Sequence, residues 1–571
     1  MDDRATQAAT AWFAASRIVD DAWQELSRAF YIQRQIGSGL TRLPDVSFAE
    51  AQRRGTVGHK LLTRLDELPA VELPRDLRLT LQLVRFRAQT WVREAEEYWT
   101  IIDPTGIGFV GLFLPTAYCG GWLLSGVHSE LAAFSFGQSG DLDRYLGLIA
   151  DYSRLIDQFS ERTAGQAERG MWMPKAQVAQ ARALLQGLKQ GARAALDVAP
   201  ERLGALRAVH FRQELETRLV EQVEPAFDRA LQGLSNDYLE QAPDAVGLGQ
   251  YRDGARVYAE LVRFHTTLDM DLQEIHALGT QRIAAIEAQM SALRAECAFA
   301  GNNAAFVAHL NTDAQWRVDT ADEVAARFQL YLQRMERKFD ALFDAAPRAG
   351  YGVAALSKAL QKSMTFGFYD RAQGIYRFNA DNLARNALFT VAALTYHELI
   401  PGHHLHLASQ RENEALHPLR QHSSLMAYNE GWAEYAATLA GEAGLYEQPE
   451  ERYGRLLMDA FLTSRLVVDT GLNALGWPLE RATQYLREHS ALSENEITSE
   501  VIRYSCDIPA QALAYKIGEI KILGLRERMS KALGPRFDLK EFHRLVLAPG
   551  ALPLITLEDE IERVLASGEA R

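Results

Sequence analysis

The chain has 571 residues, a formal net charge of −13, and 47% hydrophobic and 24% charged residues, an ordinary globular composition with room for a large core. The negative charge argues against binding to nucleic acid or to anionic membrane surfaces. Three widely spaced cysteines offer neither a disulfide framework nor a second metal site, and they fit a reducing cytosol. No linker rich in proline, serine or glycine divides the chain, so we expect one continuous unit over residues 1–571.

The first half of the chain is helical in pattern. Its N-terminus is polar and acidic with no apolar segment behind it, which predicts no secretory signal and a cytoplasmic location. Apolar residues then recur at intervals of three and four between charged faces, as in amphipathic helices. The helices predicted in this way cover residues 5–33, 78–99, 140–163, 175–196, 205–234, 250–268, 271–298 and 321–345.

The stretch from Pro104 to Gly126 carries no charge and could be mistaken for a membrane span. It contains too many glycines and prolines for a good isolated helix: Gly106, Gly108, Gly111, Pro115, Gly120 and Gly121. We therefore predict a buried, glycine-rich segment that lines a cleft.

The pattern changes near Gly367. The segment Phe366–Asn379 is aromatic and β-branched with turn residues in its middle, which predicts a short β-hairpin. Its stretch from Gly374 through Tyr376 to Phe378 is a candidate open edge, where an extended substrate peptide could add as a further strand. A hairpin packed only for stability explains the pattern equally well.

Four of the fourteen histidines fall within the ten residues from His397 to His406. In zinc hydrolases, a His-Glu-x-x-His helix places two histidines on one face to hold zinc, and the glutamate activates a water molecule. Here His397 and Glu398 are in place, but Pro401-Gly402 displaces the next histidines to His403 and His404.

Helical geometry restricts how this pattern can hold a metal. On a regular helix His403 lies about 240° around from His397, and His404 lies about 10 Å further along the axis. Deletion of Pro401-Gly402 would restore the standard spacing, so we predict a two-residue insertion that widens the turn and returns His403 to the metal. Two alternatives stay open: a helix that stops at Pro401 with His404 turned inward, and a surface histidine cluster without metal.

A third ligand is predicted in the apolar, small-residue run from Leu425 to Ala440, which has the pattern of a buried helix. Glu430 enters this helix and requires a partner, because an unpaired buried carboxylate is costly. Three protein ligands leave the open fourth position of a catalytic zinc site. The string Asn429-Glu-Gly-Trp-Ala433 also resembles the segment that supplies the glutamate ligand in gluzincin metallopeptidases.

The last informative stretch runs from Arg503 to Gly518. Amide hydrolysis generates an oxyanion that a nearby hydroxyl can stabilise, and Tyr504 and Tyr515 are chemically suitable. Arg503 and Lys516 could hold a carboxylate of the substrate.

Together these segments resemble the bacterial family called domain of unknown function 885, which is grouped with the gluzincin-like metallopeptidases. The resemblance spans roughly residues 250–530. The matching segments are Phe264–Thr267, Glu274–Gly279, Gly374–Tyr376, Tyr396–His404, Glu430–Ala433 and Arg503–Gly518. The chain departs from the family pattern at His406, where glutamine is common, and at Glu434 and Ala437, where leucine and glutamate are common.

The sequence and the resemblance predict a mainly α, two-lobed metallopeptidase-like fold with a deep cleft and a small hairpin or sheet at its edge. The expected lobes are residues 1–360, helical, and residues 361–571, catalytic. His397, His403 and Glu430 would hold one Zn²⁺ or another divalent transition metal, and Glu398 would be general base and then proton donor. Tyr504 or Tyr515 would assist the oxyanion, and Gly374, Tyr376, His404, Arg503 and Lys516 would bind substrate.

The resemblance implies that the substrates are short peptides or amino-acid amides. Two other classes of function stay open. Two histidines and one carboxylate also form the facial triad of non-haem iron oxygenases, although the adjacent Glu398 favours hydrolysis. The same scaffold could instead serve an amide-forming biosynthetic step or a binding role.

Overall fold

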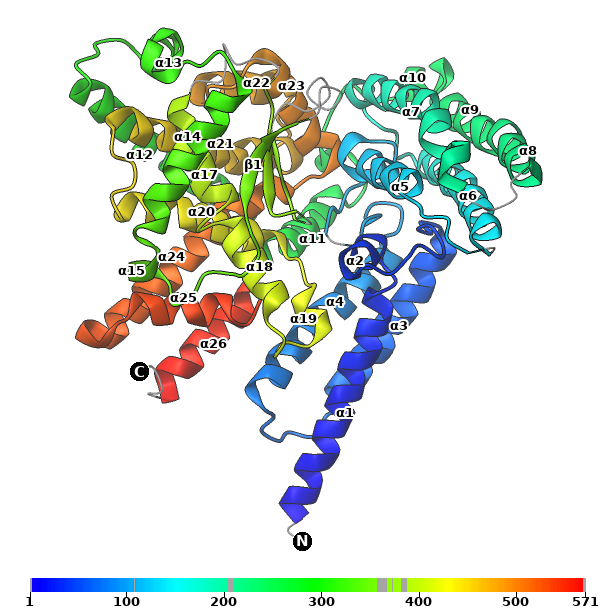
Figure 1. The fold of residues 1–571 in the computed structure, drawn as a ribbon, viewed down its shortest axis with the longest axis horizontal. Helices are drawn as coiled ribbons and strands as arrows, with labels where there is room; N and C mark the ends of the chain where they lie inside the picture. Colours follow the sequence, from blue (N-terminus) through cyan, green and yellow to red (C-terminus); the bar gives the residue numbers. More distant parts are fainter. Residues whose placement is uncertain are drawn as a thin grey trace.

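The computed structural model describes residues 3–106, 108–138, 140–203, 209–356, 367–371, 373–380 and 388–567. Within these residues the chain is mostly helical with one small sheet, which confirms the mainly α prediction (Figure 1). The helices up to residue 342 are α1 (Asp3–Leu26), α2 (Phe30–Ile36), α3 (Phe48–Asp66), α4 (Arg75–Glu96), α5 (Trp122–Ala132), α6 (Gly140–Glu168), α7 (Lys175–Leu196), α8 (Val209–Arg218), α9 (Glu224–Gly233), α10 (Asn236–Gln241), α11 (Gly254–Thr266), α12 (Leu272–Glu296), α13 (Asn303–Thr312), α14 (Ala321–Glu336) and α15 (Phe339–Leu342).

The helices beyond residue 390 carry the candidate site. They are α17 (Val391–Glu398), α18 (His403–Glu412), α19 (Pro418–Gln421), α20 (Met426–Glu442), α21 (Pro449–Asn473), α22 (Leu479–His489), α23 (Glu494–Ile502), α24 (Ala514–Leu533), α25 (Leu539–Leu547) and α26 (Leu554–Ser567). A π-helical turn, Arg503–Asp507, continues α23 directly.

The periodicity located most of the early helices correctly. The predicted segment 5–33 is divided, because Ala29 adopts an extended backbone between α1 and α2. The segment 205–234 contains α8 and α9 joined by a π-helical turn, and its residues 205–208 lie outside the described part.

The predicted hairpin is present, but its edge was predicted wrongly. The described strands form one sheet in the order β1 (Gly352–Ala355), β3 (Ile375–Phe378), β2 (Phe368–Asp370). Because β3 pairs in parallel with β1 and antiparallel with β2, its backbone is paired on both sides. No open edge therefore exists at Gly374–Phe378 for a substrate strand, and the strands with an outer edge in this sheet are β1 and β2.

The described apolar side chains gather in two large clusters and a smaller one. The larger cluster joins α1 and α4 to α14, α17, α20 and the C-terminal helices, while the second is built mainly from the segments between Phe30 and Ile275. The predicted lobe boundary at 360/361 lies outside the described residues. The larger cluster contains residues from both sides of that boundary, so the boundary does not coincide with a division between hydrophobic cores. The two lobes therefore stay a prediction. The deep cleft also stays a prediction.

The glycine-rich segment after Pro104 is largely buried, as expected. Gly111 lies so close to the segment after α23 that an added Cβ would be 2.3 Å from the carbonyl oxygen of Asp507. This segment therefore joins the first half of the chain to the C-terminal half by direct backbone packing. Among the described helices, none is long and apolar enough to span a membrane.

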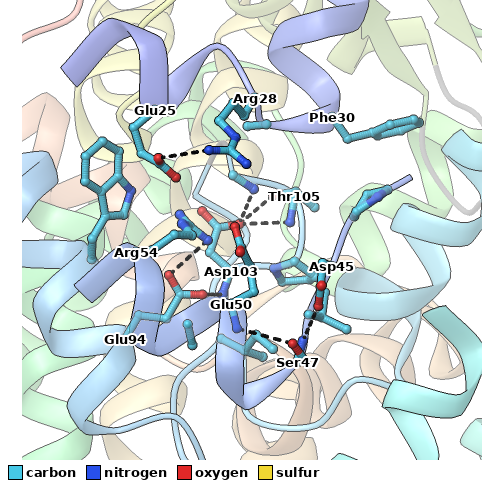
Figure 2. A pocket seen from close by; sticks show the side chains of 18 of the residues that line it. Glu25, Arg28, Phe30, Asp45, Ser47, Glu50, Arg54, Glu94, Asp103 and Thr105 are labelled. Carbon is cyan, nitrogen blue, oxygen red and sulfur yellow. Dashed lines mark hydrogen bonds and ion pairs between the residues drawn. The ribbon is translucent and has the colours of Figure 1, made fainter. Parts of the chain in front are cut away.

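A cavity of about 80 Å³ lies between the α1–α2 junction, α3, α4 and the loop at Asp103 (Figure 2). Its wall combines apolar and polar side chains, and Arg54 pairs there with the buried Glu94 at 3.4 Å. This volume is large enough to hold water. None of its lining residues belongs to the histidine cluster.

Candidate metal centre

The histidine segment consists of two helices that meet at Leu399–Gly402. Helix α17 ends at Glu398 and α18 begins at His403, so the helix is interrupted at the place where a two-residue insertion in the turn was predicted. The physical reason is Pro401, which has no amide hydrogen and disfavours a helical conformation at the residue before it. The connection is nevertheless tight, because the His404 amide donates to the Leu399 carbonyl at 3.1 Å, one residue further than in an α-helix.

Gly402 permits this tight connection. A Cβ at this position would lie 1.9 Å from the carbonyl oxygen of His397, so a side chain could not be accommodated without moving the backbone. Trp432, fully buried on α20, fixes the same connection by donating its indole N–H to the Pro401 carbonyl at 2.9 Å. The proline, the glycine and the tryptophan thus bring the start of α18 against the end of α17.

The structure brings His397, His403 and Glu430 together. One nitrogen or oxygen of each side chain lies within 4.8 Å of the others. Nε2 of His403 is 3.2 Å and Nε2 of His397 is 3.6 Å from the same oxygen of Glu430, and the two imidazole rings are nearly perpendicular. His397 lies at the end of α17, His403 at the start of α18 and Glu430 inside α20. Because these helices pack closely against one another, the protein core holds the three side chains in place.

His404 faces away from this cluster. Its Nδ1 lies 2.8 Å from the Tyr369 hydroxyl on β2, and its Nε2 lies 3.1 Å from the Ala349 carbonyl. Both ring nitrogens are therefore engaged by the hairpin side of the molecule. The geometry favours His403 over His404 as the partner of His397, while the assignment of metal ligands stays a prediction.

The cluster attracts positive charge. Burial alone would lower the pKa of His397, but the carboxylates of Glu430 and Glu434 outweigh burial and raise this pKa to about 10. Burial would likewise raise the pKa of Glu430, yet His403 and His397 hold it well below its usual range. Binding of a metal cation by these side chains would therefore release a proton from them.

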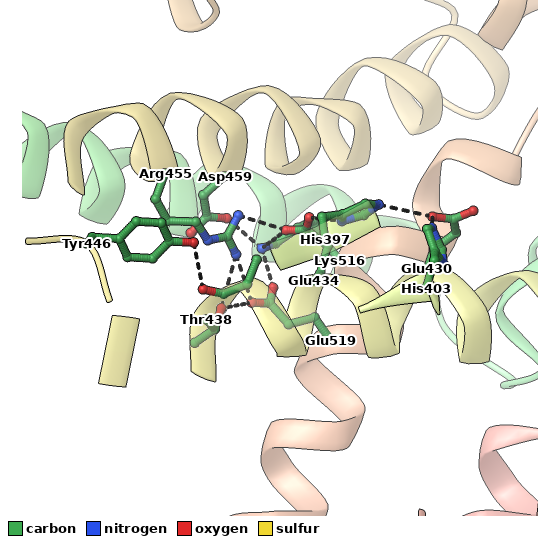
Figure 3. Close-up of polar contacts among 11 residues, drawn as sticks. His397, His403, Glu430, Glu434, Thr438, Tyr446, Arg455, Asp459, Lys516 and Glu519 are labelled. Carbon is green, nitrogen blue, oxygen red and sulfur yellow. Dashed lines mark hydrogen bonds and ion pairs between the residues drawn. The ribbon is translucent and has the colours of Figure 1, made fainter. Parts of the chain in front are cut away.

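Glu434 supports His397 from behind (Figure 3). Its carboxylate is fully buried and lies 2.8 Å from Nδ1 of His397, the ring nitrogen opposite the one that faces Glu430. The other oxygen of Glu434 accepts from Arg455 at 3.0 Å. This arrangement fixes which imidazole nitrogen carries the hydrogen and leaves Nε2 free to bind a metal.

The pairing of α20 with α24 brings further charges to Glu434. Gly431 and Gly518 let the two helices touch through their backbones, since a Cβ on Gly431 would lie 2.5 Å from the Cα of Gly518. Lys516 and Glu519, on the same turn of α24, thereby come to lie beside Glu434. This close contact explains why the Glu-Gly-Trp-Ala segment requires its glycine.

Lys516 does not fit its expected role in substrate binding. Its ammonium is fully buried, 2.6 Å from Asp459 and 3.7 Å from Glu434, and it also pairs with Glu519. Three carboxylates already surround the positive charge of Lys516, so this charge is not available to bind a carboxylate of the substrate. Lys516 instead belongs to the network that compensates Glu434.

Glu398 and Arg371 lie beside the cluster. Burial raises the pKa of Glu398, although the nearby His397 and His403 partly oppose that shift. Burial lowers the pKa of Arg371, in the turn after β2, and the charges of Glu430 and Glu398 oppose that shift. The Arg371 guanidinium is therefore within electrostatic range of both carboxylates.

The two candidate tyrosines differ in position. The ring of Tyr515 stacks on His397 with 6.4 Å between ring centroids, and its side chain is half-buried. Tyr504 is fully buried, accepts from Arg465 at 2.8 Å and donates to Glu500. Among the described contacts, Tyr504 has none with the cluster, so Tyr515 is the tyrosine placed to act there.

The remaining predicted residues lie at two sides of the cluster. Gly374, with φ of 70°, holds the β2–β3 turn close to the His404 ring, and Tyr376 on β3 is buried within electrostatic range of Glu398. Arg503, 8% exposed, lies next to Tyr515 and bonds Glu500 and Gln511.

Sequence reasoning missed the supporting roles of Glu434, Arg455 and Arg371. Two acidic residues one helical turn apart in an apolar helix, Glu430 and Glu434, were a usable signal, because a second buried carboxylate also requires a partner. Arg371 gave no such signal, since a charged residue in a hairpin turn is common.

Comparison with known proteins gives the fold and the family. No curated protein is significantly similar in sequence. A solved structure described as a "putative lipoprotein" from Colwellia psychrerythraea is 22% identical, with a TM-score of 0.79 over 98% of this chain and 99% of that one. Another, a "putative lipoprotein of unknown function" from Shewanella oneidensis, is 15% identical, with a TM-score of 0.71 over 96% and 98% of the two chains. Both share the fold.

The model of the family described as bacterial protein of unknown function, DUF885, matches residues 32–561, and the chain belongs to this family.

Proposed function

We propose that the protein is a zinc-dependent hydrolase that cleaves amide bonds of short peptides or amino-acid amides. The spacing of the candidate ligands is the observation that carries this proposal. Two ligands on a tetrahedral zinc, each at about 2.0–2.2 Å, lie about 3.4 Å apart. The two histidine nitrogens stand 3.2 and 3.6 Å from the Glu430 oxygen, close to that value.

The set of donors also fits a catalytic site better than a structural one. His397, His403 and Glu430 would hold the ion, and three protein ligands leave one position for water or substrate. Zinc, when bound, would lower the pKa of a water molecule and polarise the carbonyl of the scissile amide. Other divalent transition metals accept the same donors.

The residues around the ligands supply the remaining chemistry. Glu398, next to His397 in the chain and buried enough to have a raised pKa, would accept a proton from water and pass it to the leaving amine. The hydroxyl of Tyr515, beside His397, would stabilise the oxyanion. Tyr504 has no part in this proposal because its hydroxyl is engaged elsewhere.

Burial of the ligands favours small substrates. The side chains of His397 and His403 are 5% and 9% exposed, and that of Glu430 is 14% exposed. A folded protein could not bring its backbone to such a site, whereas a short extended peptide or an amino-acid amide is narrow enough.

The test begins with full-length protein purified without added metal. Its metal content is measured, and a mixture of short peptides is followed by mass spectrometry with and without a chelator, with Glu398→Gln as the matched control. We expect about one zinc per chain in both proteins. Hydrolysis that a chelator abolishes is expected in the wild type alone. Oxygen consumption would point to the facial-triad alternative, and peptide elongation to amide formation. Absence of zinc, or hydrolysis that a chelator does not affect, would contradict the proposal.

A further inference from the structure

A pair of arginines, Arg465 and Arg503, lies next to Tyr515. Arg465 on α21 and Arg503 are both buried, with side chains 5% and 9% exposed. They share one carboxylate, since Arg465 donates to one oxygen of Glu500 at 2.9 Å and Arg503 to the other at 3.3 Å. Burial of two guanidinium groups against one carboxylate leaves positive charge without a direct partner, which is costly.

Arg503 also keeps a donor unused. One of its terminal nitrogens donates to Gln511 at 2.5 Å and the other to Glu500, but the buried Nε has no hydrogen-bond partner among the described residues. Such an orphan donor in a native structure calls for an acceptor. A planar guanidinium with Nε unused is suited to binding a carboxylate.

Two other acids lie within electrostatic range of Arg503, yet neither pairs with it. Asp469 accepts from the Tyr258 hydroxyl at 2.6 Å and from the Ala510 amide. Asp507 accepts from the Tyr118 amide at 2.8 Å and from the Thr116 hydroxyl. Both carboxyl groups are thus held by neutral donors, and burial raises the pKa of each, to about 7 and about 6 respectively.

Contacts through Tyr515 connect the arginines to the metal centre. The Tyr515 ring stacks on His397 with 6.4 Å between ring centroids, and the Arg465 guanidinium lies 4.8 Å from the centroid of the same Tyr515 ring. Through these two contacts the Arg465 guanidinium lies at most about 11 Å from the His397 ring, a span of up to about three extended residues at 3.3–3.6 Å each. A peptide whose scissile amide reached the metal centre could therefore place a nearby carboxylate at the arginines.

The first half of the chain covers the same place. Tyr118, half-exposed in the glycine-rich segment, lies over Arg503 with 4.6 Å between guanidinium and ring centroid. The Asp507 contact with the Tyr118 amide holds that segment in position. The arginines thus lie at the junction of two distant parts of the chain, next to a half-buried tyrosine of the metal centre.

We propose that Arg503, assisted by Arg465, binds a carboxylate of the substrate, so that the preferred substrates are short peptides cleaved one to three residues from a free C-terminal carboxylate. This inference rests on the proposed hydrolysis and adds the substrate class and the direction of cleavage. An aspartate or glutamate side chain offers the same chemistry, so the experiment includes both sources.

The test uses the full-length, zinc-loaded protein and matched tetrapeptide libraries. The first library is N-acetylated, lacks acidic residues and is made as free acid and as carboxamide. The second is a carboxamide library with one aspartate or glutamate. We expect kcat/KM to be roughly 10- to 100-fold higher for the free acids, as for one strong charge-assisted hydrogen bond. A preference for the acidic carboxamides instead would assign the site to side-chain carboxylates and overturn the C-terminal assignment.

Substitutions at Arg503 then test whether this residue causes the preference for free acids. Arg503→Gln should reduce the ratio of kcat/KM for free acids to that for carboxamides to about one, while Arg503→Lys should keep part of the preference. Arg487→Gln is the matched control, because Arg487 on α22 is 44% exposed and pairs with Glu494. Equal cleavage of both forms by the wild type, or equal loss on both in Arg503→Gln, would overturn the proposal.

A binding measurement separates this proposal from the hydrolysis. Tetrapeptides with a reduced amide, CH₂–NH in place of CO–NH, are titrated calorimetrically as free acid and carboxamide. Tighter binding of the free acid to the wild type but not to Arg503→Gln supports the carboxylate site even if no peptide is cleaved. Equal binding of both forms rejects the site whatever the outcome for hydrolysis.

Discussion

The core around α6 and the core around α20 bury polar groups in different ways. Along α6 the buried side chains are mostly apolar or tyrosine, and the buried Arg162 donates to the backbone carbonyl of Leu112 and to that of Tyr98. Along α20, in contrast, two carboxylates meet charged or titratable side chains: Glu430 faces two histidines, and Glu434 meets His397, Arg455 and Lys516.

This difference indicates that the charged groups beside α20 serve the chemistry of the site and not the stability of the fold. A buried ion pair is weak evidence for stability, because desolvation offsets most of the attraction. Apolar packing around α6 needs no such pairs. A concentration of compensated charge beside α20 is therefore better explained by what it holds in place, namely the imidazole of His397.

The largest expected effect is removal of a ligand. His397→Ala or Glu430→Ala should remove zinc and abolish hydrolysis, because two remaining ligands bind far more weakly, while the apolar cores keep the chain folded. Metal analysis and circular dichroism measure the two outcomes. Full zinc occupancy in either variant would exclude that residue from the ligand set.

Removal of the base should be the next largest effect. Glu398→Gln keeps the size of the side chain but cannot accept a proton, so zinc should remain and turnover should fall by roughly 10²–10⁴-fold. The measurement is kcat on a cleaved peptide together with zinc content. Near-normal turnover would rule out Glu398 as the base.

The candidate metal centre also shows which features could be predicted from the sequence and which could not. The spacing of His397, His403 and Glu430, together with the cost of burying a carboxylate, predicted side chains that the structure does bring together. The sequence predicted a disturbed turn at Pro401-Gly402, but not the exact course of the chain over Leu399–Gly402, because hydrogen-bonding patterns around Pro401 depend on what packs against it. The role of Lys516 depends on the contact between α20 and α24, which no local pattern encodes.

A cavity created in the α6 core should destabilise the fold without changing the metal centre. Leu155→Ala, at a fully buried position, should lower the free energy of unfolding by about 2–5 kcal/mol. Zinc affinity should stay unchanged, since Leu155 belongs to the second apolar cluster and the metal helices pack mainly in the first. Urea denaturation and zinc titration test both halves of this statement, and a loss of zinc affinity would contradict the separation.

His543 on α25 provides a pH-dependent contribution near α20. Burial lowers its pKa to about 4, and its neutral form fits because Nδ1 donates to the Leu342 carbonyl while Nε2 faces the Tyr435 hydroxyl. Between pH 6.5 and about 4 the unfolded chain binds a proton that the folded chain does not. His543 therefore costs about 3 kcal/mol of stability as pH falls through this window. Urea denaturation of wild type and His543→Gln should show a shallower pH slope in the variant, and equal slopes would reject this assignment.

The smallest effect, and the sharpest test of the comparison, is expected at Glu434. Glu434→Gln keeps a hydrogen-bond acceptor for His397 but removes the charge that raises the basicity of the imidazole, so zinc affinity should fall roughly 10- to 100-fold. Glu442→Gln is the matched control on the same helix, because Glu442 is 45% exposed and pairs with Arg526. If the α20 charges only stabilised the fold, Glu434→Gln would change the midpoint of urea denaturation and leave zinc affinity as it is in the control. If they position the ligand, zinc affinity should fall while Arg455 and Lys516 keep their pairs with Glu519 and the chain stays folded.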